Sequence, residues 1–221
     1  MALESRQKAR LEDPGADLLD QLTDYWNRYG QTSLIVLGAL AVIGVGAFFM
    51  LRARRTAEDQ AAGKLAEATL AYFQSDLGRA GQLAKQVAEQ YPNTASGNDA
   101  HRLVGDASFW NSDFKTAIAE YRRYLSRQSP GLLADAATRS LAYALENDHQ
   151  YVEAAKSYDS LVGKFDRESS AEFLAAAARC LRLAGDKDGA RKHLERIAGE
   201  FGDTSYAREA RIEAAELAAH P

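Results

Sequence analysis

The side chains that could do chemistry are few and widely spaced. The four histidines lie far apart in the chain: His101, His149, His193 and His220. The sequence has no HExxH pattern, no CxxC pair and no glycine-rich phosphate loop after a strand, because no strand pattern is evident. Paired acids such as Asp186 and Asp188 fit helix caps and solvated faces better than a general acid–base pair. We therefore predict that the protein is not an enzyme and has no catalytic residue, metal site or cofactor.

The single cysteine, Cys180, excludes a disulfide within the chain. It lies between Arg179 and Leu181 in a segment that we expect to be helical. A free cysteine in such a place most often packs as a small apolar side chain. We therefore predict a packed thiol and not a nucleophile.

A better candidate for function is a set of arginines interleaved with aromatic and acidic residues. Its members are Arg102, Asp106, Phe109, Arg139, Tyr143, Glu146, Arg179 and Arg182. Arginine and aromatic side chains are enriched where protein interfaces gain most of their binding energy. We predict that these eight residues line a protein-binding groove. Each charged member taken alone fits an exposed, solubilising charge equally well.

The groove depends on a repeat that runs through the C-terminal three quarters of the chain. Four alanines mark it, spaced 37, 37 and 36 residues apart: Ala80, Ala117, Ala154 and Ala190. A small residue lies twelve positions before each of them: Ala68, Gly105, Ala142 and Ala178. Two antiparallel helices approach closely where both carry small side chains, so each pair of positions predicts a helix–helix contact. An ordinary helical bundle with accidental periodicity is the alternative.

Larger residues and turn signals follow the same register. Ala84, Tyr121, Tyr158 and Leu194 lie four positions after the marker alanines, and Val87, Tyr124, Leu161 and Ile197 lie seven after. We expect both sets to pack against the next repeat. Turn residues separate the paired helices at 111–113, 147–149 and 185–188, and Pro92, Pro130 and Gly202 separate one repeat from the next.

This pattern resembles the tetratricopeptide repeat (TPR), most closely in Gly105…Ala117…Tyr121…Pro130. The period is longer than the consensus of 34, and the usual tryptophan is absent from the first helices. We predict repeats at about 96–130, 131–167 and 168–202, a weaker one at 57–95 and a capping helix at 204–218. The resemblance implies an all-α solenoid of helix pairs over residues 52–221. The Lys and Asn pattern of carboxylate-clamp TPR domains is not present, so we do not predict capture of a chaperone C-terminus.

Residues 33–51, SLIVLGALAVIGVGAFFML, contain no charge. As a helix they span about 28 Å, close to the hydrocarbon thickness of a bilayer. A buried core helix would need an amphipathic interruption, which this run lacks. A signal peptide would have a shorter apolar core and a small-residue cleavage site. Here 32 residues precede the run, and it ends in Phe48-Phe49-Met50-Leu51-Arg52 with no Ala-x-Ala. We predict one uncleaved transmembrane helix.

The tail at 1–32 carries a second helical pattern. Asp13-Pro14 is a typical helix start. An apolar and aromatic face follows, made by Leu18, Leu22, Tyr25, Trp26 and Tyr29. Aromatic residues next to an apolar span suit the headgroup region, so we predict an interfacial helix that leads into the anchor. A docking helix for another membrane protein is the alternative.

The charge balance excludes a nucleic-acid partner. The tail has four basic and six acidic residues, and the remainder has 23 basic and 25 acidic residues. Binding to a phosphate backbone needs a clear excess of Lys and Arg, which neither part has. We therefore expect protein partners only.

A short tail, one anchor and about 170 residues of divergent TPR-like sequence together resemble the bacterial family of ancillary SecYEG translocon subunits, whose repeat domain is similar to that of the cell-division coordinator found with the Tol system. The resemblance implies a non-enzymatic protein of the bacterial inner membrane with its repeats in the periplasm. It also implies a chaperone-like role, with the SecYEG translocon, periplasmic chaperones or nascent clients as partners.

The charges that flank the span predict the opposite orientation. Only Arg28 precedes it at close range, whereas Arg52, Arg54, Arg55 and Lys64 follow it. The positive-inside rule would keep the repeats in the cytoplasm, but it weakens for long domains. We follow the family orientation. A structural scaffold for one defined envelope or cytochrome-maturation complex, bound through the arginine-rich groove in a salt-sensitive way, is the alternative function.

Overall fold

The computed structural model describes the backbone of residues 14–219 and the side chains of residues 18–219, and every regular element in this range is a helix. The helices are α2 (Pro14–Phe73), α3 (Leu77–Gln90), α4 (Ala95–Trp110), α5 (Phe114–Leu125), α6 (Leu132–Asn147), α7 (Tyr151–Asp159), α8 (Arg167–Leu183), α9 (Lys187–Glu200) and α10 (Ala207–Ala219). The expected cap at Asp13, the rest of the tail before it and His220 lie outside the described residues.

Contacts group the chain into two compact units, Met1–Arg55 and Thr56–Pro221. Helix α2 contributes to both units, because it runs without a break across Arg55. It also continues past positions 32 and 51, where the sequence predicts that the tail and the membrane span end. Those two boundaries mark where the chain is predicted to enter and leave the membrane, and neither is the end of a helix. They stay predictions.

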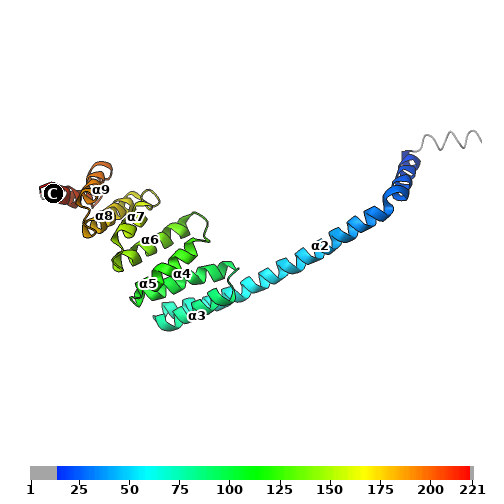
Figure 1. Cartoon of the computed structure of the whole chain (residues 1–221), viewed down its shortest axis with the longest axis horizontal. Coiled ribbons are helices and arrows are strands. Elements are labelled where there is room, and N and C mark those ends of the chain that lie inside the picture. Colours follow the sequence, from blue (N-terminus) through cyan, green and yellow to red (C-terminus); the bar gives the residue numbers. More distant parts are fainter. Residues whose placement is uncertain (1–13, 220–221) are drawn as a thin grey trace, which may run out of the picture. The chain divides into compact units, whose positions relative to one another are not determined.

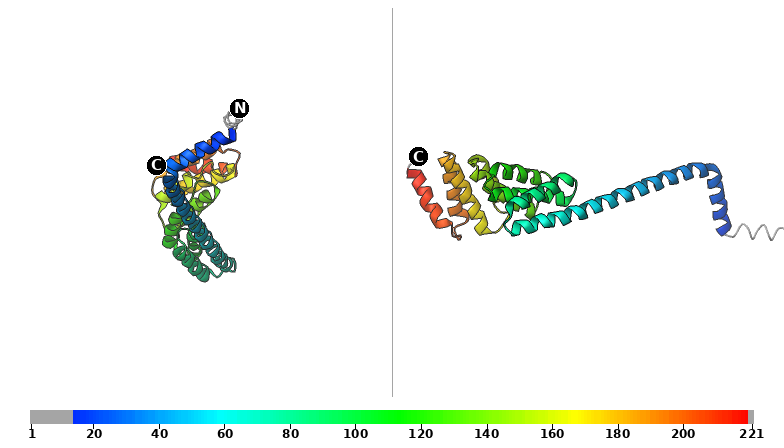
Figure 2. Two further views of the ribbon diagram at one scale, coloured as in Figure 1. Left: turned by 90° about the vertical axis from the view of Figure 1, so that its right-hand side faces the viewer. Right: turned by 90° about the horizontal axis from the view of Figure 1, so that it is seen from below.

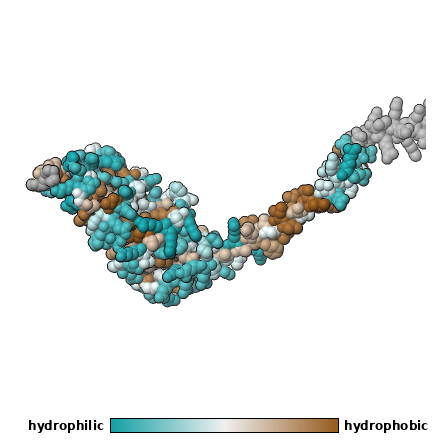
Figure 3. Space-filling view, viewed as in Figure 1, coloured by the Kyte–Doolittle hydropathy of each residue, from teal (hydrophilic) through white to brown (hydrophobic). Residues whose placement is uncertain are grey.

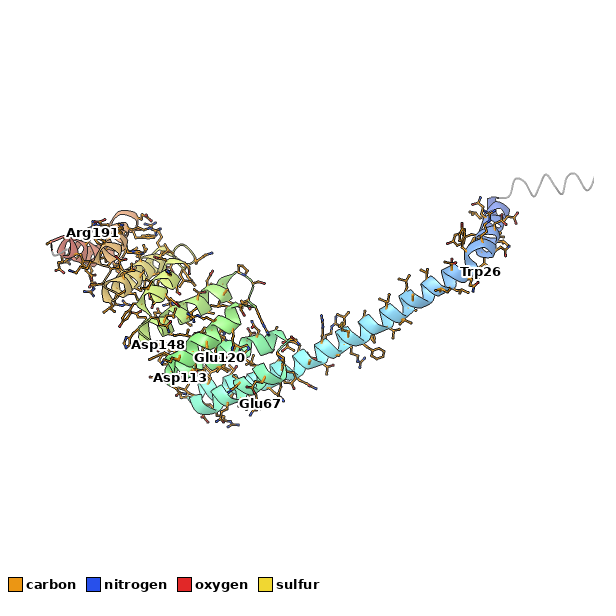
Figure 4. All side chains as sticks on the ribbon, viewed as in Figure 1. Trp26, Glu67, Asp113, Glu120, Asp148 and Arg191 are labelled. Carbon is orange, nitrogen blue, oxygen red and sulfur yellow. The ribbon has the colours of Figure 1, made fainter. Side chains whose placement is uncertain are left out.

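The N-terminal part of α2 begins at Pro14, as the sequence predicts, and changes direction before the apolar run (Figure 2). Trp26 lies at this bend (Figure 4), and a Cβ built at Gly30 would lie 3.3 Å from its ring. Glycine, which lacks a Cβ, allows the ring to cover the backbone there and is a common cause of helix bending. The predicted amphipathic face from Leu18 to Tyr29 is more than half exposed at each position.

The apolar run of α2 is fully exposed. Helix α2 contains a window apolar enough to cross a membrane, and none of that window is buried. Brown, apolar surface surrounds this part of α2 (Figure 3). A core helix of a soluble protein would be mostly buried, so the core-helix alternative does not fit the described residues.

The second unit is a stack of helix pairs. The first helices of the pairs, called A helices from here on, are the C-terminal part of α2 from residue 56, then α4, α6 and α8; the second helices, called B helices, are α3, α5, α7 and α9. Each B helix packs against the next A helix along the chain, and α10 packs against α9 at the end of the stack (Figure 1). The predicted all-α fold, an apolar N-terminal helix followed by TPR-like helix pairs, is confirmed.

The small-residue register holds each pair together. All eight of its residues are buried: Ala68, Gly105, Ala142, Ala178, Ala80, Ala117, Ala154 and Ala190. The approach is tight at Gly105, where a Cβ would lie 2.7 Å from the ring of Tyr121. The residues four and seven positions after the marker alanines are buried too, Tyr121, Tyr124 and Tyr158 among them. The core therefore follows the sequence period.

One turn geometry joins the helices of every pair. Its middle residue has a positive φ each time: Ser75 (62°), Ser112 (59°), His149 (61°) and Gly185 (87°). The next residue caps the B helix, and Asp76, Asp113 and Asp186 do so by accepting a backbone N–H bond three residues on, at 3.2, 3.2 and 2.8 Å. Asp113 and Asp148 show two of these turns on the same side of the stack (Figure 4). The turn at Ser75 gives the weak first repeat the same geometry as the others.

Candidate protein-binding surface

The predicted groove residues lie on the A helices, and the structure shows most of them paired with neighbours. On α4, the Arg102 guanidinium donates to the Asp106 carboxylate at 2.7 Å. The Tyr121 hydroxyl of α5 donates to the same carboxylate at 2.9 Å. Burial raises the pKa of Asp106, and Arg102 opposes that rise. Phe109 is half-buried and meets Trp110 and Phe114 edge to face, with centroids 5.6 Å apart in each pair.

Two residues of α6 form a second cluster with α8. Arg139 donates from Nε to the Tyr143 hydroxyl at 3.0 Å and from a terminal nitrogen to Glu172 at 3.4 Å. The Tyr143 hydroxyl donates to the same Glu172 oxygen at 3.1 Å. The Arg139 guanidinium also lies over the ring of Phe173, 5.8 Å from its centroid. These contacts tie two successive A helices together.

The third cluster also joins α6 to α8. Glu146 accepts two hydrogen bonds from Arg179, at 2.7 and 3.0 Å, and one from the Tyr158 hydroxyl at 2.8 Å. Burial alone would raise the pKa of Glu146, but these hydrogen bonds outweigh it and the pKa is lowered. The pair is bidentate and half-buried, which is the geometry in which an arginine–carboxylate pair stabilises most.

Cys180 packs against this cluster as the sequence predicts. It is fully buried, and burial raises the pKa of its thiol to about 12. The nearby charge of Glu146 adds to that rise. A thiol held neutral in this way is a poor nucleophile.

The last predicted residue, Arg182, borders a groove between α8 and α10. It reaches Glu213 of α10 at 3.4 Å, a loose and exposed contact. The groove has a volume of about 820 Å³, and Arg179, Tyr206, Arg208 and Ile212 also line it. Three arginines and three glutamates line it, so the groove can accept a polypeptide segment of mixed charge.

The structure therefore divides the eight predicted residues into clusters. Six form contacts within or between A helices, Phe109 packs in an aromatic group, and Arg182 faces the groove beside α10. Sequence reasoning missed Glu172 and Glu213, which are the acidic partners of Arg139 and Arg182. The repeat register gave no signal for these partners, because it does not fix how successive helices are offset along the stack, and α10 lies outside the repeats.

Among the described residues, no group of three or more His, Cys, Asp or Glu side chains could hold a metal ion. The histidines make local contacts instead. His101 bonds to Glu120 at 2.6 Å, His149 to the Tyr151 hydroxyl at 2.7 Å, and His193 to Asp159 at 2.8 Å. Each contact joins neighbouring helices or a turn to its helix.

Comparison with known proteins agrees with this architecture. A tetratricopeptide repeat family pattern matches residues 176–204, which cover the end of α8 and all of α9. The stack therefore has a TPR-like fold. The match falls on the repeat predicted at 168–202, whereas the sequence motif closest to the consensus lies in the repeat at 96–130.

Solved TPR-like structures resemble the stack as well. Nearly identical TPR-like repeats from a Podosopora anserina chain assigned as a kinesin light chain superpose with a TM-score of 0.56 at 16% identity, over 72% of this chain and 86% of that chain. A point variant of those repeats gives the same TM-score and identity over 72% and 85%. At this identity the likeness shows the fold alone. No curated protein matches the chain in sequence.

Proposed function

We propose that the protein is a membrane-anchored protein-interaction module that assists newly translocated proteins as a chaperone-like accessory of the Sec translocon. One observation carries this proposal: the helix that supplies the first A helix of the TPR-like stack also contains an apolar window of which no part is buried. Such a helix needs a lipid environment. Stacked repeats present extended surfaces to other polypeptides.

The paired charges support broad and weak binding over a single salt-sensitive partner. Four arginines of the predicted groove already have an acidic partner within the chain: Arg102, Arg139, Arg179 and Arg182. A partner that needed them would first have to break these ion pairs. The scaffold alternative relies on free arginines, so the accessory function fits the described residues better.

Membrane orientation tests the proposal first. One reporter active only outside the cytoplasm and one active only inside it are fused after Pro221 in the full chain. We expect the outside reporter to work, with Arg52, Arg54 and Arg55 as tolerated exceptions to the positive-inside rule. Activity of the inside reporter alone would exclude the translocon function.

A second experiment tests the client role. The full chain in detergent is mixed with a chemically unfolded test protein, and light scattering follows aggregation. We expect the chain to slow aggregation, and to do so equally well at low and high salt, because its groove charges are already paired. Binding of one partner only, lost in high salt, would favour the scaffold.

A further inference from the structure

The first repeat has an outer face that nothing in the described chain covers. Each A helix carries one small residue of the register: Gly105 on α4, Ala142 on α6 and Ala178 on α8. Four positions around this residue lie on the side of the helix that faces the preceding B helix. They are the positions five, two and one residues before it and two residues after it. On α2 these positions hold Gly63, Ala66, Glu67 and Leu70, and all four are exposed. Together with Asp59 and Phe73, both also exposed, they form what we call the open face.

The same positions are buried in the later repeats, apart from the half-buried Ser140. The equivalents of Leu70 are Ala107, Ala144 and Cys180, each at most 1% exposed, whereas Leu70 itself is 58% exposed. The equivalents of Gly63 are Ala100, Ala137 and Phe173, which are also at most 1% exposed. Three internal examples thus show that this face of an A helix is built to be covered.

A B helix covers it in each of those three cases, and on α8 the side chains of Arg139 and Glu146 from α6 add to the cover given by α7. Helix α3 packs on α4 so closely that a Cβ built at Gly81 would lie 3.6 Å from the Cβ of Ala107. Ile118 and Tyr121 of α5 share a buried cluster with Leu141 of α6. The open face of α2 therefore corresponds to the face that a B helix covers in each later repeat. A helix is the element that would fit on it.

A polar end cap is the simplest alternative, and the two ends of the stack differ in this respect. Terminal repeats stay soluble through a polar outer face. At the far end, α10 exposes Arg208, Glu209, Arg211 and Glu216. The open face instead exposes Leu70 beside Gly63 and Ala66, which allow close backbone approach. Phe73 is 78% exposed, but its equivalents Trp110 and Leu183 are exposed as well, so Leu70 carries the contrast. The far end is the more charged of the two, although Ile212 of α10 is 54% exposed there.

Charge decides between possible occupants. The charged groups of the open face are Asp59 and Glu67, and neither has an ion-pair partner in the described structure. A second copy packed face to face would bring four carboxylates together, which is unfavourable. A helix with basic residues beside its apolar seam would pair with both.

We propose that the open face binds an amphipathic helix of a partner protein, with a small-residue and apolar seam flanked by Lys or Arg. This helix takes the place that B helices take in the later repeats. The site lies away from the groove between α8 and α10, so it adds a second partner surface to the proposed function. It does not depend on which side of the membrane the repeats face.

The test uses the full chain in detergent and a fluorescent peptide of residues 113–128, the basic B helix that covers α6. We expect the peptide to bind, and Ala66→Arg in the chain to weaken binding about tenfold or more by blocking close approach and repelling the basic helix. Ala215→Arg, an exposed alanine of α10, is the matched control and should bind like the unchanged chain. A peptide with Lys115, Arg122 and Arg123 changed to Glu should bind more weakly.

Absence of binding, or equal binding by the Ala66→Arg chain, would overturn the proposal. A dimer seen by light scattering that Ala66→Arg dissociates would also overturn it, in favour of a second copy. Both variants should keep the melting temperature of the unchanged chain, because both positions are exposed. The aggregation assay with an unfolded test protein should be unaffected by Ala66→Arg, so failure at the open face is distinguishable from failure of the proposed function.

Discussion

At the residue scale, polar side chains stabilise this stack where they are half-buried and accept or donate several hydrogen bonds. Glu146 is the clearest case, since three hydrogen bonds from Arg179 and Tyr158 converge on its carboxylate, whose side chain is only 17% exposed. The Arg122–Glu153 pair is the opposite case, because both side chains are more than half exposed. Solvent and ions screen the second pair far more than the first.

We expect Arg179→Ala to lower the free energy of unfolding by about 1–2 kcal/mol, because it leaves the half-buried Glu146 carboxylate without its charged donor. Arg122→Ala is the matched control and should cost less than about 0.5 kcal/mol. Urea unfolding followed by circular dichroism measures both. Equal losses for the two variants would show that burial of the Glu146 cluster does not strengthen its ion pair.

His193 gives the stack a pH-dependent contact. Its Nε2 lies 2.8 Å from Asp159 of α7 and its Nδ1 lies 2.8 Å from the Gly189 carbonyl, so the charged ring donates to both acceptors. The bond to Asp159 raises the pKa of His193, while burial and the nearby Arg196 oppose that rise. A raised pKa means that this stabilisation is fully present below the ordinary histidine pKa of about 6.5 and is lost as pH rises through the folded-state value.

We therefore expect the stability difference between the unchanged chain and His193→Gln to be largest near pH 5.5 and to shrink by about pH 8. Urea unfolding at the two pH values measures it. His149→Gln serves as the control, since His149 bonds to a neutral tyrosine hydroxyl. A difference that grows with pH would contradict the assigned role of Asp159.

At the scale of elements, the turn inside each pair repeats one backbone shape with different residues. Ser75, Ser112 and His149 adopt the left-handed conformation that glycine adopts at 185. Side chains other than glycine are strained there, so three of the four turns carry a cost that the surrounding helices offset. Glycine is the usual residue at this place after a helix.

We expect Ser112→Gly to stabilise the chain by about 1 kcal/mol and Gly185→Ala to destabilise it by a similar amount. Both positions are exposed, so neither change alters core packing. Thermal unfolding of the two variants gives the signs. Destabilisation by Ser112→Gly would mean that the serine side chain, and not the backbone shape, holds the turn.

The close contact of α4 with α5 makes a second element-scale test. Alanine favours helices over glycine by about 1 kcal/mol, yet a Cβ at 105 would lie 2.7 Å from the buried ring of Tyr121. We expect Gly105→Ala to lower stability by about 1–3 kcal/mol, because the ring and its bond to Asp106 must shift. Gly199→Ala, where a Cβ meets nothing within 4 Å, should raise stability. Urea unfolding that ranks both variants above the unchanged chain would contradict this packing.

At the scale of the whole molecule, the sequence period predicts the helix pairs, because small residues mark the close contacts and every marked position is buried. The partners of the charged residues were not predictable in the same way. Glu146 meets Arg179 and Arg139 meets Glu172 only because successive A helices are offset along the stack, and that offset follows from three-dimensional packing. The open face emerges only when burial is compared between repeats.

The continuity of α2 leads to the last prediction. The sequence suggests a tail, an anchor and a repeat domain, yet the tail from Pro14 on, the anchor and the first helix of the repeats form one helix, and contacts divide the chain between Arg55 and Thr56. The polar and small residues that pack on α3 and α4, from Glu58 to Ala68, all lie in the second unit. The repeats should therefore fold without the apolar run.

We expect a chain that begins at Thr56 to stay in solution after ultracentrifugation and to keep the melting temperature of the full chain, because the apolar window is not buried. The full chain should sediment with membranes and stay there after a carbonate wash, as an integral span requires. Changing Glu58 to Ala in the short chain gives an internal control. It should lower the melting temperature, since Glu58 accepts the backbone N–H groups of Ala95 and Ser96 at 2.7 and 3.1 Å. A full chain released by carbonate would show that α2 does not span the bilayer, and an unfolded short chain would show that the apolar run supports the repeats.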